Sequence, residues 1–163
     1  MSDQKDEKIL QEEDTQHGRF LTFLLGKEVF GMEIKHVTEI IGMQAITAVP
    51  EVPTYVKGII NLRGKIIPVI DVRLKFKKEP VPYGDRTCII VIDIHEISVG
   101  LIIDNVSEVL TISDDDIAVP PSNRTGFENK YIKGIGKSEN CVTLLLDCEK
   151  LLNDDEIYAV SNI

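Results

Sequence analysis

Side chains able to catalyse a reaction or hold a metal are few in this sequence, and they are scattered. The three histidines show neither an HExxH motif nor the paired spacing of a zinc site. They are His17, His36 and His95. A serine or cysteine nucleophile would need a base and an orienting group beside it, and the sequence offers no such set. We therefore predict a protein that is not an enzyme, with no metal and no cofactor.

The remaining reactive groups have structural interpretations. The odd cysteine count without a CxxC pair predicts reduced, buried apolar residues, with redox sensing as the alternative. These are Cys88, Cys141 and Cys148. The acidic run 114–116 lacks the spacing of a calcium loop, so with Ser113 before it we expect a helix N-cap or a solvated loop. The glycines of 134–136 lack the third glycine of a dinucleotide-binding turn.

Net charge limits the classes of partner. The 163 residues carry a formal charge of −9, which gives no basic footprint for nucleic acid and argues against anionic membrane surfaces. No apolar run approaches the roughly 20 residues of a membrane helix, and the polar first residues do not resemble a signal peptide. We expect a cytoplasmic protein that binds no nucleic acid and does not insert into a membrane.

Short apolar runs separated by turn residues predict an all-β fold with four hairpins. The runs are 20–25, 29–34, 56–62, 65–71, 87–94, 97–106, 131–137 and 141–146, and short helices are expected at 72–76 and 147–152. The run 89–92 is apolar at every position, which indicates burial on both of its faces.

An internal repeat determines the expected architecture. The segment 31–40 (GMEIKHVTEI) aligns with 100–109 (GLIIDNVSEV), and 55–59 (YVKGI) aligns with 131–135 (YIKGI) in the same order. Such a repeat predicts two similar small barrels, whose closed sheets leave no exposed edges and whose junction forms a groove. We expect a flexible arm at 1–18, a domain at 19–152 with barrel one at about 19–80 and barrel two at about 86–152, a joining segment at 77–84, and a loose tail at 153–163.

The two copies also separate what the fold needs from what one copy adds. Gly58 and Gly134 hold equivalent places inside strands, which favours a bulge or a barrel corner. Arg63 lies at a hairpin tip, whereas the equivalent tip at 138–140 carries no cation. An arginine on a rigid turn can bind a carboxylate with two charge-assisted hydrogen bonds, and a solvated turn cation is the alternative.

The sequence resembles the CheW-like domain family of bacterial chemotaxis. The resemblance rests on residues 30–41, 55–71, 99–106 and 131–135, and the stretch GIINLRGKIIPVID at 58–71 is its most specific part. It covers about residues 19–152 and implies two tandem five-stranded SH3-like barrels with short helices. The 163 residues leave no room for an ATPase, a phosphorylated histidine domain or a receiver, so a single-domain adaptor is expected.

The resemblance implies scaffolding between chemoreceptor tips and the regulatory domain of the histidine kinase CheA. The receptor's helical hairpin would lie in the groove between barrels. For that surface we select Arg63, Glu39, Val37, Ile40, Val99, Leu101 and Val106, with a plain core position as the alternative for each apolar residue. For the kinase-facing surface we select Ile46, Val49 and Gly58.

Two other functions stay open. The same fold could serve a different chemosensory kinase pathway, or the groove could bind a small molecule. The absence of convergent catalytic residues argues against the second.

Overall fold

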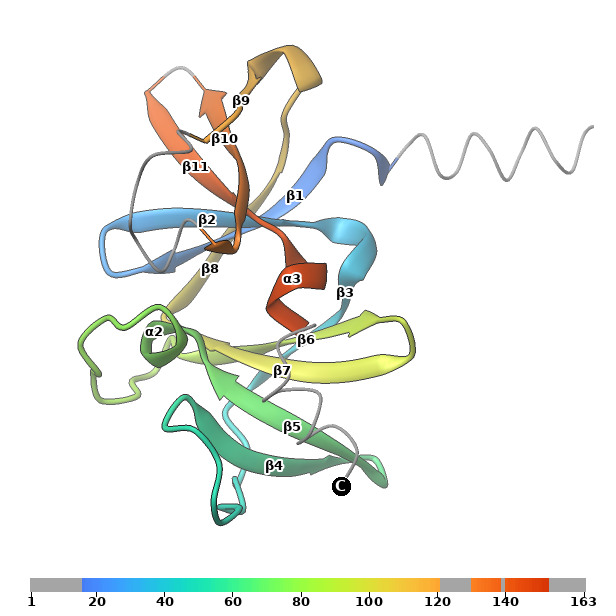
Figure 1. The fold of residues 1–163 in the computed structure, drawn as a ribbon, viewed down its shortest axis with the longest axis vertical. Coiled ribbons are helices and arrows are strands. Elements are labelled where there is room, and N and C mark those ends of the chain that lie inside the picture. The colour runs from blue at the N-terminus through green and yellow to red at the C-terminus, as the bar shows by residue number, and fades with distance from the viewer. Residues whose placement is uncertain (1–15, 121–129, 139, 153–163) are drawn as a thin grey trace, which may run out of the picture.

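The computed structural model describes residues 16–120, 130–138 and 140–152, and the fold is mostly β. The strands form two sheets with short helices, as predicted (Figure 1). Sheet A has the order β8 (Asn105–Thr111), β1 (Arg19–Leu25), β2 (Glu28–Glu33), β11 (Cys141–Leu146), β10 (Ile132–Ser138), β9 (Ile117–Ala118). Sheet B has the order β3 (Val37–Gly42), β6 (Cys88–Ile94), β7 (Ile97–Ile103), β5 (Lys65–Asp71), β4 (Val56–Leu62). The short helices are η1 (Ile34–His36), α2 (Val72–Lys75), η2 (Asp114–Asp116) and α3 (Cys148–Leu152).

The repeats exchange their first hairpins. The hairpin β1–β2 lies in sheet A with strands of the second repeat, and β6–β7 lies in sheet B with strands of the first repeat. The expected boundaries of barrel one at 19–80 and barrel two at 86–152 therefore do not match the sheets, because each sheet takes strands from both repeats. Each sheet is instead completed by a parallel pairing between repeats, β5 with β7 and β11 with β2.

The pairing registers confirm the repeat. Gly31 pairs with Leu145, and its counterpart Gly100 pairs with Val69, the counterpart of Leu145. Likewise, the counterparts Val37 and Val106 pair with equivalent positions of the first hairpins, in β6 and β1 respectively. The alignment found in the sequence is therefore also an alignment of backbone hydrogen bonds.

Sheet B closes on itself beyond its last strand. Thr47, in the segment that follows β3, exchanges two backbone hydrogen bonds of 2.9 Å with Ile59 of β4. The edge strands β3 and β4 are thereby connected through this segment. Closure covers the free N–H and C=O groups that an open edge would expose.

Three apolar clusters lie among the residues that the structure describes. The central cluster takes side chains from both sheets and from α2 and α3, including Phe23, Phe30 and Leu151. A smaller cluster lies within each sheet, around Ile60 in sheet B and Phe20 in sheet A. In the run 89–92, residues alternate between the cluster of sheet B and the central cluster, which confirms that both faces are buried.

Equivalent backbone devices recur in both repeats. The strand pairing shifts register between Val56 and Gly58, and again between Ile132 and Gly134, so both glycines mark bulges as expected. Asp71 accepts a hydrogen bond from the backbone N–H of Leu74 at the start of α2, and Asp147 accepts one from Lys150 in α3. The run 114–116 is a 3₁₀ turn capped by Ser113, which confirms its structural interpretation.

Some elements were absent from the sequence prediction. Strands β3, β8 and β9 were missed, and the strand expected at 97–106 is two strands separated by Asp104. At Asp104 the chain leaves sheet B and enters sheet A, so an unbroken strand would not reach its second partner. Most of the predicted arm (1–15) and the whole tail (153–163) lie outside the described residues.

Candidate partner-binding surfaces

Two of the predicted polar residues contact each other. Nη2 of Arg63, at the β4–β5 turn, donates to both carboxylate oxygens of Glu39 in β3, each at 2.6 Å. The Arg63 side chain is 71% exposed and that of Glu39 is 26% exposed. The pair therefore presents an aligned guanidinium and carboxylate at the surface of sheet B.

The turn that carries Arg63 has a defined geometry. Arg63 and Gly64 both have positive φ, 53° and 86°, as a two-residue hairpin turn requires. The backbone N–H of Gly64 donates to Oδ1 of Asn61 at 2.8 Å, which fixes the turn from inside. The Asn-Leu-Arg-Gly sequence thus holds the guanidinium on a rigid support.

Sheet B also carries exposed apolar side chains. Ile40 in β3 is 45% exposed and Ile66 in β5 is 49% exposed. The equivalent residues of sheet A, Val109 and Val142, are exposed as well. Its exposure leaves Ile40 available for the receptor surface, for which the sequence selected it, and excludes the core alternative. Ile66 was missed because it lies within an otherwise buried strand.

Two other receptor-binding candidates are core residues. Val99 and Leu101 are completely buried in the central cluster, which matches the core alternative stated for them, so their side chains are absent from the surface. The continuous apolarity of β7 already signalled burial on both faces. Val37 and Val106 are half-buried against the same central cluster and lie on different sheets, Val37 on sheet B and Val106 on sheet A.

The predicted kinase-facing residues lie where the segment after β3 pairs with β4. Ile46 and Val49 are half-buried in the segment that covers β4. Gly58 has φ of 143°, and a Cβ there would lie 2.1 Å from the carbonyl oxygen of Thr47. Since only glycine tolerates both conditions, the fold itself accounts for Gly58. Glycine also has no side chain to offer a partner.

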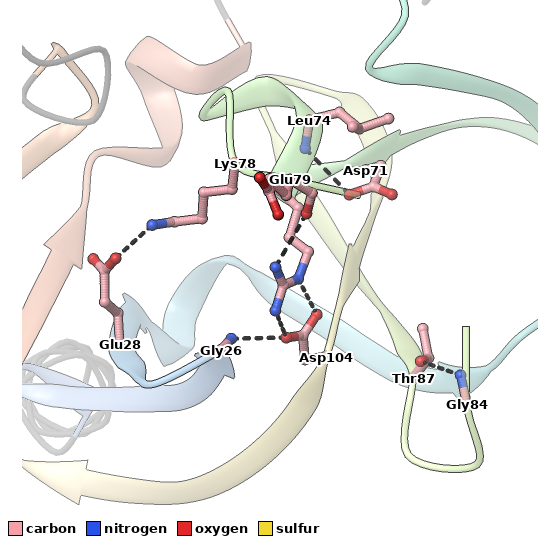
Figure 2. A network of polar contacts seen from close by, with 10 residues as sticks. Gly26, Glu28, Asp71, Leu74, Lys78, Glu79, Gly84, Thr87 and Asp104 are labelled. Carbon is pink, nitrogen blue, oxygen red and sulfur yellow. Dashed lines mark hydrogen bonds and ion pairs between the residues drawn. The ribbon is translucent and has the colours of Figure 1, made fainter. Parts of the chain in front are cut away.

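A polar network bridges the two sheets (Figure 2). Arg73 of α2 donates to both carboxylate oxygens of Asp104, at 2.7 and 2.5 Å, and the backbone N–H of Gly26 donates to the same carboxylate at 2.7 Å. Lys78 and Glu28 form an ion pair alongside at 2.5 Å. The hydrogen bond from Arg73 lowers the pKa of Asp104 and raises that of Arg73 itself.

Other titrating groups are shifted by burial. Burial, helped by neighbouring Lys35, lowers the pKa of His36. Burial raises the pKa of Cys88, and it raises the pKa of Cys148 to about 12. The cysteine prediction is confirmed for Cys148, which is buried, whereas Cys88 and Cys141 are only partly covered.

An aromatic cage around Lys75 was not foreseen. The side chain is 5% exposed, and its Nζ lies 4.0 Å from the ring centroid of Tyr55 and 5.2 Å from that of Tyr131. The two tyrosines are the first residues of the repeated YxKGI motifs, one from each repeat. The repeated tyrosine was the one sequence pattern that could have indicated this contact. The residues next to Lys75 in the sequence gave no indication that its side chain is buried.

The described residues were compared with two kinds of site, a metal-binding cluster and a membrane-spanning helix. No group of three histidine, cysteine or acidic side chains there is arranged to hold a metal ion. Likewise, within 16–120, 130–138 and 140–152 no helix is long and apolar enough to cross a membrane. A hollow of about 340 Å³ lies against sheet A, but Glu33 within it already pairs with Lys35 and Lys133.

Comparison with known proteins gives consistent matches over the domain. The family model described as the CheW-like domain matches residues 19–156. The chemotaxis protein CheW of Klebsiella aerogenes is 37% identical over 144 residues, covering 88% of this chain and 87% of the relative. That of Treponema pallidum is 32% identical over 149 residues, covering 89% and 88%. The crystal structure of the scaffolding protein TtCheW from Thermoanaerobacter tengcongensis has a TM-score of 0.75 at 35% identity, covering 80% of this chain and 88% of that one.

Proposed function

The chain belongs to the CheW-like domain family, and we propose that it couples chemoreceptors to the histidine kinase CheA. It is a non-enzymatic scaffold of chemotaxis signalling. The coupling needs two protein-binding surfaces, one for the receptor tip and one for the regulatory domain of the kinase. The surface of sheet B around Arg63 and Glu39 is the observation that carries this proposal.

The receptor surface centres on the Arg63–Glu39 pair. An exposed guanidinium that is already held by a carboxylate loses little side-chain freedom when a partner arrives. Ile40, the next residue in β3, offers exposed apolar area on the other face of the strand. Val37 at the start of the same strand is half-buried at the edge of the central cluster. Charged and aliphatic side chains along the edge strand β3 suit the side of an amphipathic helix. We retain Arg63, Glu39, Ile40, Val37 and Val106 as receptor contacts.

The kinase surface is proposed on the segment that joins β3 to β4 in sheet B. Ile46 and Val49 lie on the segment that crosses β4, and their partial exposure leaves apolar area for a second barrel. Gly58 contributes by allowing this segment to approach β4 closely. Recruitment to receptor arrays at the membrane from the cytoplasm would then follow from the receptor contact alone.

Calorimetric titration against the CheA regulatory domain of the same organism tests the kinase contact. Saturable binding at micromolar affinity or tighter is expected. If two folded proteins show no binding, the kinase assignment fails, and a different chemosensory pathway or a ligand-binding role takes its place.

Arg63→Ala tests the receptor contact. Binding to receptor cytoplasmic fragments is expected to weaken about tenfold or more, because an aligned charge–hydrogen-bond partner is worth about 1.5–3 kcal/mol. Lys137→Ala is the matched control, since Lys137 is an exposed cation on the equivalent hairpin of the second repeat. Equal loss in both variants would show that general charge, not this site, attracts the receptor.

A further inference from the structure

The internal repeat places two equivalent corners where the sheets meet. Gly26 corresponds to His95, Asp104 to Lys35, and Arg73 to Glu149. We call Gly26, Arg73 and Asp104 the arginine corner, and Lys35, His95 and Glu149 the histidine corner. In Figure 1 the β1–β2 turn and the β6–β7 turn, which carry Gly26 and His95, point to opposite sides of the molecule.

Each corner contains one of the chain crossings between the sheets. At the arginine corner the crossing is Asp104, between β7 and β8. At the histidine corner it is η1, between β2 and β3. Since both crossings connect the same two sheets, the contacts at each corner set how far the sheets can move there.

The arginine corner is tightly closed. Asp104 in the crossing receives hydrogen bonds from Arg73 and from the Gly26 backbone, all between 2.5 and 2.7 Å. The Arg73 side chain is 14% exposed and that of Asp104 is 26% exposed, so water screens the pair weakly. Arg73 also donates to the backbone carbonyl of Glu79, which ties the joining segment to the same point.

The histidine corner is loosely paired. Nε2 of His95 lies 3.8 Å from Oε1 of Glu149, and the two side chains are 69% and 56% exposed. Lys35, the counterpart of Asp104, turns to Glu33 at 3.1 Å instead of bonding across the corner. Compared with the arginine corner, the charges at equivalent positions are thus reversed in sign. The His95 and Glu149 side chains are exposed to water, and no close hydrogen bond joins them.

From this asymmetry we infer that the arginine corner is a fixed hinge and that the sheets open and close at the histidine corner. A bidentate, partly buried ion pair resists separation, whereas an exposed pair at 3.8 Å contributes little. The central apolar cluster keeps the sheets together and limits the motion to a small rotation. Strand β3 begins at the histidine corner, so the motion would adjust the proposed receptor surface; this consequence rests on the proposed function, whereas the hinge does not.

Relaxation-dispersion NMR on the free protein tests the hinge. Millisecond exchange is expected at amides 34–37, 94–97 and 147–150, and is expected to be absent at 25–28 and 103–106. Exchange of equal size at both corners, or exchange at neither corner, would overturn the inference.

Asp104→Asn tests what holds the hinge. This variant is expected to speed solvent exchange of the Gly26 amide about tenfold and to extend millisecond exchange to the arginine corner. Glu149→Gln is the matched control, and it should leave the arginine corner unchanged. If Asp104→Asn does not fold, Arg73→Lys removes the two-pronged contact while keeping the charge. Unchanged dispersion in the folded variant would refute the hinge. Neither measurement involves a partner, so failure to bind kinase or receptor would leave the result intact.

Discussion

The two repeats have the same backbone features but different surface side chains. Both keep an in-strand glycine with a bulge, an aspartate that caps the following helix and a tyrosine whose carbonyl accepts that aspartate's N–H. Only the first repeat places an arginine at its hairpin tip, where it contacts Glu39, while the counterpart Glu108 has no such partner among the described residues. What both copies keep serves folding, and what one copy adds is the better candidate for binding.

The exchange of hairpins strengthens this comparison. Because each sheet contains strands of both repeats, neither repeat can close its own sheet alone. The shared features therefore stabilise a single cooperative unit, and damage to either copy is expected to affect the whole domain.

Gly58→Ala gives the largest expected difference between the repeats. Its φ of 143° and the 2.1 Å approach to the Thr47 oxygen combine backbone strain with a clash against main chain, which we expect to cost roughly 3 kcal/mol or more. Gly134→Ala would meet a methyl group of Ile117 at 2.8 Å, and a side chain can yield, so about 1–2 kcal/mol is expected. Urea denaturation of both variants measures the comparison. Equal losses would mean that the two bulges are equally constrained.

Arg73→Met compares the corners through stability. Removing the guanidinium leaves Asp104 partly buried without its main partner, and the expected cost is about 1–3 kcal/mol. Glu149→Gln, at the histidine corner, breaks an exposed pair and should change stability by no more than about 0.5 kcal/mol. Thermal unfolding of the two variants provides the measurement. If both variants lose a similarly small amount of stability, the arginine corner is held no more firmly than the histidine corner.

The sequence predicted what is periodic and repeated, and it failed where distant segments meet. The hairpins, the Ser113 cap and both bulges followed from local patterns, and so did the outward position of Arg63. The hairpin exchange did not, because adjacent and exchanged pairing bury the same apolar faces and present the same alternation. The contact between Arg63 and Glu39 depends on closure of sheet B, and the burial of Lys75 depends on tyrosines from both repeats. No local pattern encodes either.

His36→Asn compares the histidine corner with its counterpart, because the second repeat carries Asn105 at that place. A lowered pKa means that folded His36 binds a proton less readily than the unfolded chain does. Its contribution to stability is therefore complete above about pH 6.5 and is lost as the pH falls below that value. The free energy of unfolding measured between pH 7.5 and 5 should decline less in His36→Asn than in the native chain. Parallel curves would assign the pH dependence to other groups.

The smallest expected effect concerns the Arg63–Glu39 pair, and it separates binding from folding. Arg63 is 71% exposed, so a double-mutant cycle of Arg63→Ala and Glu39→Ala should give a coupling free energy for folding of only about 0.2–1 kcal/mol. The same cycle measured by receptor binding should give a larger coupling, because a bound partner excludes water from the pair and weakens its screening. A pair that contributes more to folding than to binding would be a structural tie that closes sheet B between β3 and the β4–β5 turn. The first repeat's additional arginine would then serve the fold, and the rule that features present in one copy mark the binding surface would fail at its strongest example.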